Sequence, residues 1–326
     1  MELVTKKRLH LVSGRANLPL AVDIADHLGV ELGEPNIAEF ANGEIHCRFG
    51  ESVRGTDVFI IQSHNAFEGG SVNDAIIEHL VMVDAAKRAS AKRITAVCPF
   101  FGYGRQDRKA EGREPITAKL MANAFRAAGA SRMIAVDLHS GQIQGFFDGP
   151  WDHLTAMPVI IDHLRELGPD IVIASPDAGR VKVAERYSLA LGADLAFVHK
   201  SRVKGAKNQV EAKEVIGHVD GRDCVLIDDM IDTGGTIVAA AEALIERGAT
   251  SVQAATTHGV FSGPAIDLLK NSAIERILMT DTLPLPPEKQ IDKIEVLSIS
   301  GVIAKAIDAV FEDTSVSEIF GGNNLS

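Results

Sequence analysis

A short pattern recurs along the chain and restricts the folds that it can adopt. It consists of a helix-like stretch, a small or glycine stop, and an alanine followed by an apolar, strand-like run. The pattern is clear at residues 91–98 and 130–137, and looser at 249–256 and 273–280. Strands that alternate with helices in this way form right-handed βαβ units around a parallel sheet. Because the pattern occurs twice in each half, we predict two similar α/β domains rather than one large sheet.

A break in this pattern predicts where the two domains divide. Residues 149–151 read Gly-Pro-Trp, so we place the domains at 8–149 and 150–301. The C-terminal helix, about residues 302–326, is expected to join the first domain. Residues 200–213 carry many charges and few apolar side chains, which predicts a long exposed loop between two strands, a lid.

Composition limits the class of protein. The chain has 326 residues, of which 46% are hydrophobic, enough for a sizeable core. Its formal net charge is −11 and only 5% of its residues are aromatic, so we expect no nucleic-acid partner. The N-terminus lacks the apolar run of a signal peptide, and no stretch is long and apolar enough to span a membrane. We therefore expect a cytoplasmic protein without membrane contact.

The cysteines give no sign of a disulfide framework or a zinc site. Cys47, Cys98 and Cys224 form no Cys-x-x-Cys pair, and the last two lie in apolar, strand-like runs. Such residues are expected to be reduced and buried in the core.

The segment 224–236 carries the most specific chemical signal. An apolar strand runs into the adjacent carboxylates Asp228 and Asp229, and a loop of threonine and glycine then opens a helix near Thr236. N–H groups at a helix N-terminus bind phosphate, and carboxylates accept hydrogen bonds from sugar hydroxyls. The segment is neither a Walker A motif nor a dinucleotide fingerprint. It favours a site for a phosphorylated ribose over a strand that merely ends in solvated acids.

Residues 99–109 follow another strand-like run, at the sheet edge where open α/β sheets bind ligands. Arg105, Arg108 and Lys109 offer cations for a polyphosphate, and Gln106 can bind a base edge. The aromatic and glycine residues before them favour a binding function over an ordinary basic turn.

Two more segments follow strand-like runs. Residues 137–148 contain His139, although a single histidine at a strand end is more often structural. Residues 175–182 contain Asp177, which with backbone N–H groups can serve Mg²⁺ and a diphosphate, but the segment equally fits a tight turn.

The predicted lid is strongly basic. Lys200 and Arg202 open it, and Lys204 and Lys207 extend it. Spacing alone leaves open whether they are solvated charges or a lid that closes over a phosphoryl group as negative charge develops on it.

Together these segments resemble the ribose-phosphate pyrophosphokinases of the phosphate-regulated class, over nearly the whole chain. Residues 225–236 resemble that family's ribose-5-phosphate loop, and 102–109 resemble its ATP-contacting segment. Residues 137–148 match the stretch that supplies a metal-ligand histidine, and 40–44 resemble the segment that reaches across a subunit contact to bind adenine.

The resemblance implies two tandem type I phosphoribosyltransferase-like domains, each a mainly parallel sheet flanked by helices. It also implies an enzyme that transfers the β,γ-diphosphoryl group of ATP to the anomeric hydroxyl of ribose 5-phosphate. The products are AMP and phosphoribosyl pyrophosphate, and Mg²⁺ is required. Dimers that build a hexamer, with phosphate and ADP as effectors, are implied as well.

Functional residues carry over from this resemblance position by position. Catalysis is assigned to Lys200 and Arg202. The ATP-binding residues are Phe40, Asn42, Glu44, Arg105, Gln106, Asp107 and His139. The residues for ribose 5-phosphate are Asp228, Asp229, Asp232, Thr233, Gly234, Gly235 and Thr236. The diphosphate loop is Asp177, Ala178, Gly179 and Arg180, and the metal ligands are His139 and Asp177. The allosteric residues are Ser52, Arg54, Ser315, Ser317 and Phe320.

One position departs from the pattern of the family. Many relatives carry paired glycines after Asp-Ala, whereas this chain has Gly179-Arg180. Arginine adopts positive φ less readily than glycine, so Arg180 either changes the shape of the loop or adds a cation to it.

Three other functions compete with this interpretation. A phosphoribosyltransferase would share the ribose-phosphate loop but needs only one such domain and no counterpart of residues 105–109. A non-catalytic regulatory homologue would be expected to lose Lys200, Arg202, His139 or the acid pair, all of which are present. A gene regulator that senses phosphoribosyl pyrophosphate would need a DNA-binding element and a basic patch, and the sequence shows neither.

Overall fold

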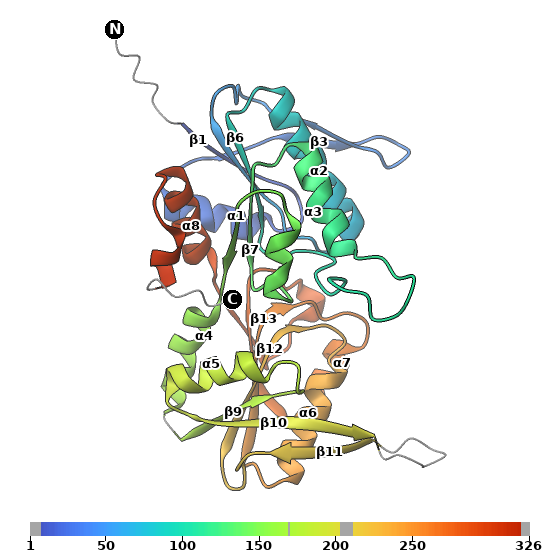
Figure 1. Ribbon diagram of the computed structural model, residues 1–326, viewed down its shortest axis with the longest axis vertical. Helices are drawn as coiled ribbons and strands as arrows, with labels where there is room; N and C mark the ends of the chain where they lie inside the picture. Colours follow the sequence, from blue (N-terminus) through green and yellow to red (C-terminus); the bar gives the residue numbers. More distant parts are fainter. Residues whose placement is uncertain (1–7, 169, 203–210, 321–326) are drawn as a thin grey trace. The chain divides into compact units, whose positions relative to one another are not determined.

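The structure is a computed structural model that describes residues 8–168, 170–202 and 211–320 (Figure 1). The chain divides into two compact units. The first contains the chain up to Thr155, the segment Thr282–Pro284 and the residues from Ser298 onward. The second contains Ala156–Asp281 and Leu285–Leu297.

A six-stranded parallel sheet in the order β2-β1-β5-β6-β7-β8 forms the first unit. Its strands are β1 (Leu9–Ser13), β2 (Leu32–Gly33), β5 (Asp57–Ile61), β6 (Arg93–Cys98), β7 (Arg132–Val136) and β8 (Trp151–Leu154). Every residue of β5 is buried, as expected for a strand that is covered on both faces. Since β8 lies beyond residue 149, the first unit is longer than the sequence predicts.

Helices cover both faces of this sheet, with α1 and α8 on one side and α2 and α3 on the other (Figure 1). They are α1 (Leu18–Leu28), α2 (Val72–Arg88), α3 (Thr117–Ala128) and α8 (Ser300–Phe311). A capping box between Ser71 and Asp74 starts α2, and Gly129, with φ 127°, ends α3. A separate antiparallel hairpin contacts α2 and consists of β3 (Asn36–Glu39) and β4 (Ile45–Arg48). Because α8 packs on α1, the C-terminal helix belongs to the first unit.

The second unit has a seven-stranded sheet in the order β11-β10-β9-β12-β13-β14-β15. Its strands are β9 (Ile171–Ser175), β10 (Asp194–Arg202), β11 (Glu211–Ile216), β12 (Asp223–Ile231), β13 (Ser251–Gly259), β14 (Ile274–Thr280) and β15 (Ile294–Leu297). All neighbours are parallel except β10 and β11, which form an antiparallel hairpin at one edge. The predicted loop at 200–213 is therefore shorter: its first three and last three residues lie on strands, and 203–210 lie outside the described residues.

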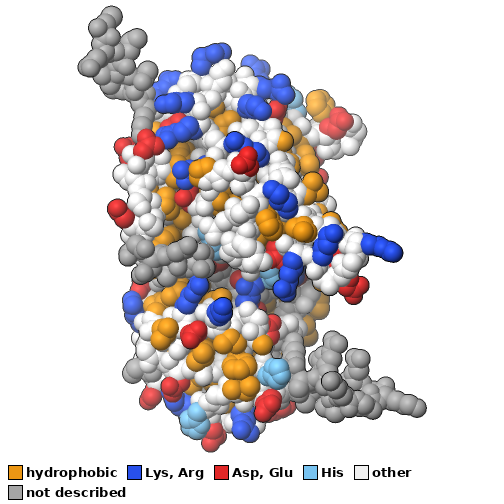
Figure 2. All heavy atoms as spheres, viewed as in Figure 1, with side chains coloured by type: hydrophobic (Ala, Val, Ile, Leu, Met, Phe, Trp, Pro, Cys, Tyr) orange, Lys and Arg blue, Asp and Glu red, His pale blue; other side chains and the backbone are white. Residues whose placement is uncertain are grey.

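The helices of the second unit are α4 (Met157–Leu164), α5 (Val181–Leu191), α6 (Gly235–Glu246) and α7 (Ala265–Lys270). Buried aliphatic residues of β9, β12, β13 and β14 pack with those of α6 in one core. Among the described residues, no helix combines the length and the apolar character that crossing a membrane requires. On the face drawn in Figure 2, basic and acidic side chains are interspersed over both units.

Cys98 and Cys224 are buried and Cys47 is half-buried, and all three are free thiols. Burial raises the pKa of each, and to about 11 for Cys47 and Cys224, so these cysteines are protonated and unreactive at neutral pH.

Candidate active site

In the first unit, two of the predicted segments leave the sheet side by side. β6 and β7 are parallel neighbours, and Cys98 at the end of β6 pairs with Ala135 of β7. The loops 99–109 and 137–148 follow these strands, so both begin at the carboxyl edge of the sheet, where open α/β sheets bind ligands.

Asp107 holds these two loops together. Its carboxylate is buried, and its Oδ2 accepts hydrogen bonds from Ser140 Oγ at 2.6 Å and from Gln142 Nε2 at 3.1 Å. Asp107 therefore supports the stretch next to His139. Gln106 is exposed, but its Oε1 accepts a hydrogen bond from Thr117 Oγ1 at the start of α3. Arg105 is exposed at the same edge.

Both loops contain a non-glycine residue with positive φ: Tyr103 at 63° and Asp137 at 37°. Such conformations cost energy and persist only where surrounding contacts fix them, often at functional sites. Gly104 permits a close approach, because a Cβ there would lie 3.3 Å from the Phe101 carbonyl oxygen and 3.6 Å from His139 Cβ. The ATP-type segment and His139 are thus in direct proximity.

The segment predicted to bind adenine, residues 40–44, lies on another element of the first unit. Phe40, Asn42 and Glu44 are exposed at the turn of the β3–β4 hairpin, and the Phe40 side chain is 58% exposed. Arg15 ties this hairpin to α2, because its guanidinium bonds Glu39 of β3 and the fully buried Glu78 of α2, both at 2.6 Å.

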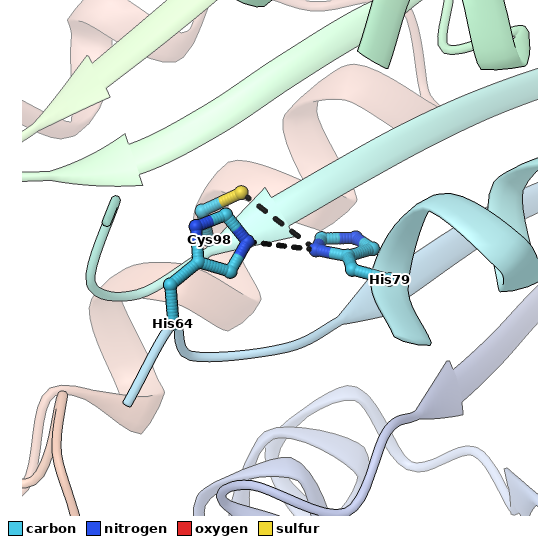
Figure 3. A group of neighbouring side chains, drawn as sticks. All are labelled: His64, His79 and Cys98. Carbon is cyan, nitrogen blue, oxygen red and sulfur yellow. Dashed lines mark hydrogen bonds between the residues drawn. The ribbon is translucent and has the colours of Figure 1, made fainter. Parts of the chain in front are cut away.

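His64, His79 and Cys98 form a buried cluster (Figure 3), which is bonded to the backbone of the loop 99–109. The Gly102 N–H donates to His64 Nδ1 at 3.1 Å. A backbone N–H can only donate, so His64 Nδ1 must be unprotonated. His64 Nε2 therefore carries the proton and donates to His79 Nδ1 at 3.2 Å. Burial lowers the pKa of His64 to about 3 and that of His79 well below its usual value.

This protonation pattern argues against a metal in the cluster. The ligand atoms of the three residues lie within 4.8 Å of one another, which is close enough for one ion. A neutral histidine binds a metal through an unprotonated nitrogen, however, and His64 offers its lone pair to Gly102 instead. The cluster therefore serves to fix the backbone at Gly102.

In the second unit, the connection from β12 to α6 has the predicted strand–loop–helix form. Asp228 and Asp229 lie near the end of β12, and the Asp229 N–H donates to Asp228 Oδ1 at 2.8 Å. Gly234 caps α6 with φ 80°, which only glycine adopts without strain. Thr233 and Thr236 are exposed beside this helix start, as a phosphate site requires.

The diphosphate-type loop follows β9, the parallel neighbour of β12. Asp177 Oδ1 accepts a hydrogen bond from the Gly179 N–H at 2.8 Å, which fixes its carboxylate. Arg180 has φ −111°, so the arginine needs no left-handed conformation here. Its guanidinium pairs with the acids of β12, with Nη2 2.8 Å from Asp229 Oδ1 and Nε 3.6 Å from Asp228 Oδ1. Arg180 therefore brings a cation to the acid pair without adopting a left-handed backbone conformation.

The acid pair has unusual electrostatics. The pKa of Asp228 is raised to about 8, first by burial and then by the neighbouring Asp229, while Arg180 acts in the opposite direction. The pair shares less negative charge near neutral pH than two solvated carboxylates would.

The structure describes the remaining predicted residues only in part. Lys200 and Arg202 lie on β10, opposite Lys213 and Glu211 of β11 in register, and their side chains lie outside the described residues. The other lid cations, Lys204 and Lys207, also lie outside them.

The predicted allosteric residues belong to the first unit. Ser52, Arg54, Ser315 and Ser317 are exposed, and Phe320 is half-buried. Ser315 Oγ and Ser317 Oγ are 2.8 Å apart in a hydrogen bond.

Comparison with known proteins decides the family. The N-terminal domain of ribose phosphate pyrophosphokinase matches residues 9–129, and the phosphoribosyl synthetase-associated domain matches residues 203–321. The ribose-phosphate pyrophosphokinase of Bifidobacterium longum is 51% identical over 319 residues, with 96% of this chain and 93% of the relative covered. That of Streptomyces avermitilis is 53% identical over 317 residues, with 97% of each covered. The chain belongs to the ribose-phosphate pyrophosphokinase family.

The fold agrees with this assignment. The crystal structure of phosphoribosylpyrophosphate synthetase from Mycobacterium smegmatis matches with a TM-score of 0.88 and 47% identity, over 94% of this chain and 100% of that one. The predicted family and α/β fold class are thus confirmed: the chain is an enzyme of the ribose-phosphate pyrophosphokinase type with two α/β domains, each built on a mainly parallel sheet flanked by helices.

Sequence reasoning missed several residues that support the site of this pyrophosphokinase. One is His153, whose Nε2 accepts a hydrogen bond from the Leu138 N–H at 2.8 Å, next to His139. His64, His79 and Arg15 are others. The available signal was the presence of polar residues just after β5, such as His64, and on the buried face of α2, such as His79. Such groups are rarely buried without a partner.

Proposed function

We propose that this chain transfers the β,γ-diphosphoryl group of ATP to the anomeric hydroxyl of ribose 5-phosphate, giving AMP and phosphoribosyl pyrophosphate. The β12–α6 connection is the observation that carries the proposal. It combines a pair of carboxylates with a glycine-capped helix start and two exposed threonines, which suits the two ends of a phosphorylated ribose.

In this proposal the second unit holds the sugar. Asp228, Asp229 and Asp232 accept hydrogen bonds from the ribose hydroxyls and so orient the anomeric oxygen. The exposed threonines and the N–H groups at the start of α6 bind the 5-phosphate, since the helix dipole favours an anion there. The anomeric oxygen forms a bond to the β-phosphorus and loses its proton, while the bond from that phosphorus to the α-phosphate oxygen breaks and AMP leaves.

The first unit is proposed to hold ATP. Arg105 and Gln106 contact the nucleotide, with Asp107 and His139 beside them, and the β3–β4 hairpin supplies the adenine contacts. Phosphoryl transfer depends on position and on neutralised charge rather than on covalent chemistry. We assign this neutralisation to Lys200 and Arg202.

Mg²⁺ is proposed as the cofactor, and it would neutralise charge on the phosphates. The carboxylate of Asp177 fits a hard cation and is already oriented by the Gly179 N–H. His139 offers a nitrogen, which is a less usual ligand for magnesium.

Other features are proposed by similarity to the family. They are a homo-oligomer in which dimers form a hexamer, activation by phosphate, inhibition by ADP, and a cytoplasmic location. The residues proposed for the effector site are Ser52, Arg54, Ser315, Ser317 and Phe320.

A product assay tests the proposed reaction. Purified protein is incubated with Mg²⁺, ATP and ribose 5-phosphate, and nucleotides are separated by ion-exchange chromatography. AMP and phosphoribosyl pyrophosphate are expected in equal amounts. Formation of ADP would show that the γ-phosphate moves instead, and turnover that requires a free base would favour a phosphoribosyltransferase.

A pair of variants links the reaction to the site. Asp228→Asn removes a carboxylate from the proposed sugar site and should reduce the rate strongly. Asp223→Asn makes the same change at the exposed, opposite end of β12 and should leave the rate unchanged. If both variants keep full activity, the acid pair does not bind the sugar. If the unaltered protein binds both substrates without turnover, it is a regulatory homologue.

A further inference from the structure

Arg180 joins the diphosphate loop to the acid pair of the proposed ribose site. It lies at the start of α5, after the loop that follows β9, and contacts both acids of β12. Its side chain is 15% exposed, and those of Asp228 and Asp229 are 15% and 7% exposed. This is a nearly buried triad of one cation and two adjacent anions, at the position where the sugar is proposed to bind.

Two adjacent carboxylates in such a place need a cation nearby. Burial penalises the charged form of each, and each disfavours ionisation of the other. A protonated carboxyl would be a poorer acceptor for a sugar hydroxyl, because it gives one oxygen to its own proton. Ribose hydroxyls are neutral and cannot supply the missing positive charge.

The charges of this triad also depend on one another. Removal of one member of a buried charge group leaves the others uncompensated, which is costly.

We propose that Arg180 is a positioning residue for the sugar, the resident counter-ion that favours the ionised form of Asp228 and Asp229 and holds their side chains toward the ribose hydroxyls. This inference rests on the proposed function of the β12–α6 connection. It gives Arg180 a role at the sugar end of the site, in addition to the diphosphate loop where the sequence places it.

The test compares Arg180→Gln with Arg180→Lys by steady-state kinetics in both substrates. Arg180→Gln should raise KM for ribose 5-phosphate by about tenfold and leave KM for ATP within about twofold. Arg180→Lys keeps the charge and should recover most of the loss. Lys182→Gln, which removes an exposed cation two residues further along, is the matched control and should change neither KM.

Calorimetric titration of ribose 5-phosphate in the absence of ATP makes the test independent of turnover. Weaker binding to Arg180→Gln than to Arg180→Lys supports the proposal even if no variant forms AMP, in which case only the proposed reaction fails. Equal or tighter binding to Arg180→Gln would overturn it, because the arginine would then be neutral toward the sugar or would block its site. If Arg180→Gln does not fold, the same decision rests on Arg180→Lys, whose affinity must lie within about threefold of the unaltered protein.

Discussion

The buried histidine pair predicts a specific weakness of the first unit toward acid. His64 and His79 are fully buried and neutral, and His64 holds the Gly102 N–H through its unprotonated Nδ1. The informative perturbation is His64→Asn, because the asparagine Oδ1 can accept the same backbone hydrogen bond while the titrating ring is removed. The variant separates the titration of the ring from its role as an acceptor.

The magnitude follows from the pKa of His64, which burial lowers from 6.5 to about 3. Below pH 6.5 the unfolded chain binds a proton at this residue and the folded chain does not, so stability falls as the pH falls. Each pH unit costs about 1.4 kcal/mol, which amounts to about 2 kcal/mol at pH 5 and about 5 kcal/mol when pH 3 is reached. Above pH 6.5 the ring is neutral in both states and contributes no pH dependence.

Urea unfolding followed by Trp151 fluorescence measures this directly. Trp151 is the only tryptophan of the chain and packs against Phe101 in the first unit, so its signal reports on that unit. Between pH 7.5 and pH 5 the unaltered protein should lose about 2 kcal/mol more unfolding free energy than His64→Asn. Cys98→Ala is the control, because it opens a cavity in the same cluster but removes no imidazole. Equal losses in the unaltered protein and His64→Asn would refute the buried, neutral state of His64.

Three further outcomes are expected. Because the pKa of Asp228 is raised to about 8, KM for ribose 5-phosphate should fall as the pH rises from 7 to 9, and a pH-independent KM would contradict the carboxylate role. Gly234→Ala should lower the unfolding free energy by about 1 kcal/mol and weaken ribose 5-phosphate binding, because Gly234 has φ 80°. Gly235→Ala is the control: its Cβ would meet open space, so it should change the melting temperature little. Asp107→Ala removes the acceptor of the Ser140 and Gln142 hydrogen bonds, so it should lower the unfolding free energy by about 1–3 kcal/mol in urea and raise KM for ATP. An unchanged KM would show that the two loops act independently.

Much of the fold was predictable from local patterns. The helix at 117–128 and the strands in the repeated pattern have the apolar periodicity of their class, and the structure contains them. The hairpin of β10 and β11 was not predicted at residues 200–202 and 211–213. Apart from Ala212, those residues are polar or charged, which is typical of an edge strand as well as of a loop. Only the pairing between strands distinguishes the two.

The candidate site was predictable where its residues lie together in the sequence. Asp228 to Thr236 form one connection, so their chemistry can be inferred without a fold. The partners that hold such segments come from elsewhere: Gly102 and His64 are 38 residues apart, and Asp107 and Ser140 are 33 apart. Patterns among neighbouring residues in the sequence cannot reveal contacts between residues so far apart along the chain.

The same reasoning explains why the effect of Arg180 was ambiguous in the sequence. A glycine in a tight loop is usually needed for its backbone, so its loss predicts a distorted loop. In the structure Arg180 has an ordinary negative φ, and its effect is electrostatic, because its side chain extends to Asp229 on the neighbouring strand. The order of β9 and β12 in the sheet makes that contact possible. A substitution in one ligand loop of a parallel sheet therefore has to be judged by the loop of the adjacent strand, since the charge it adds acts there.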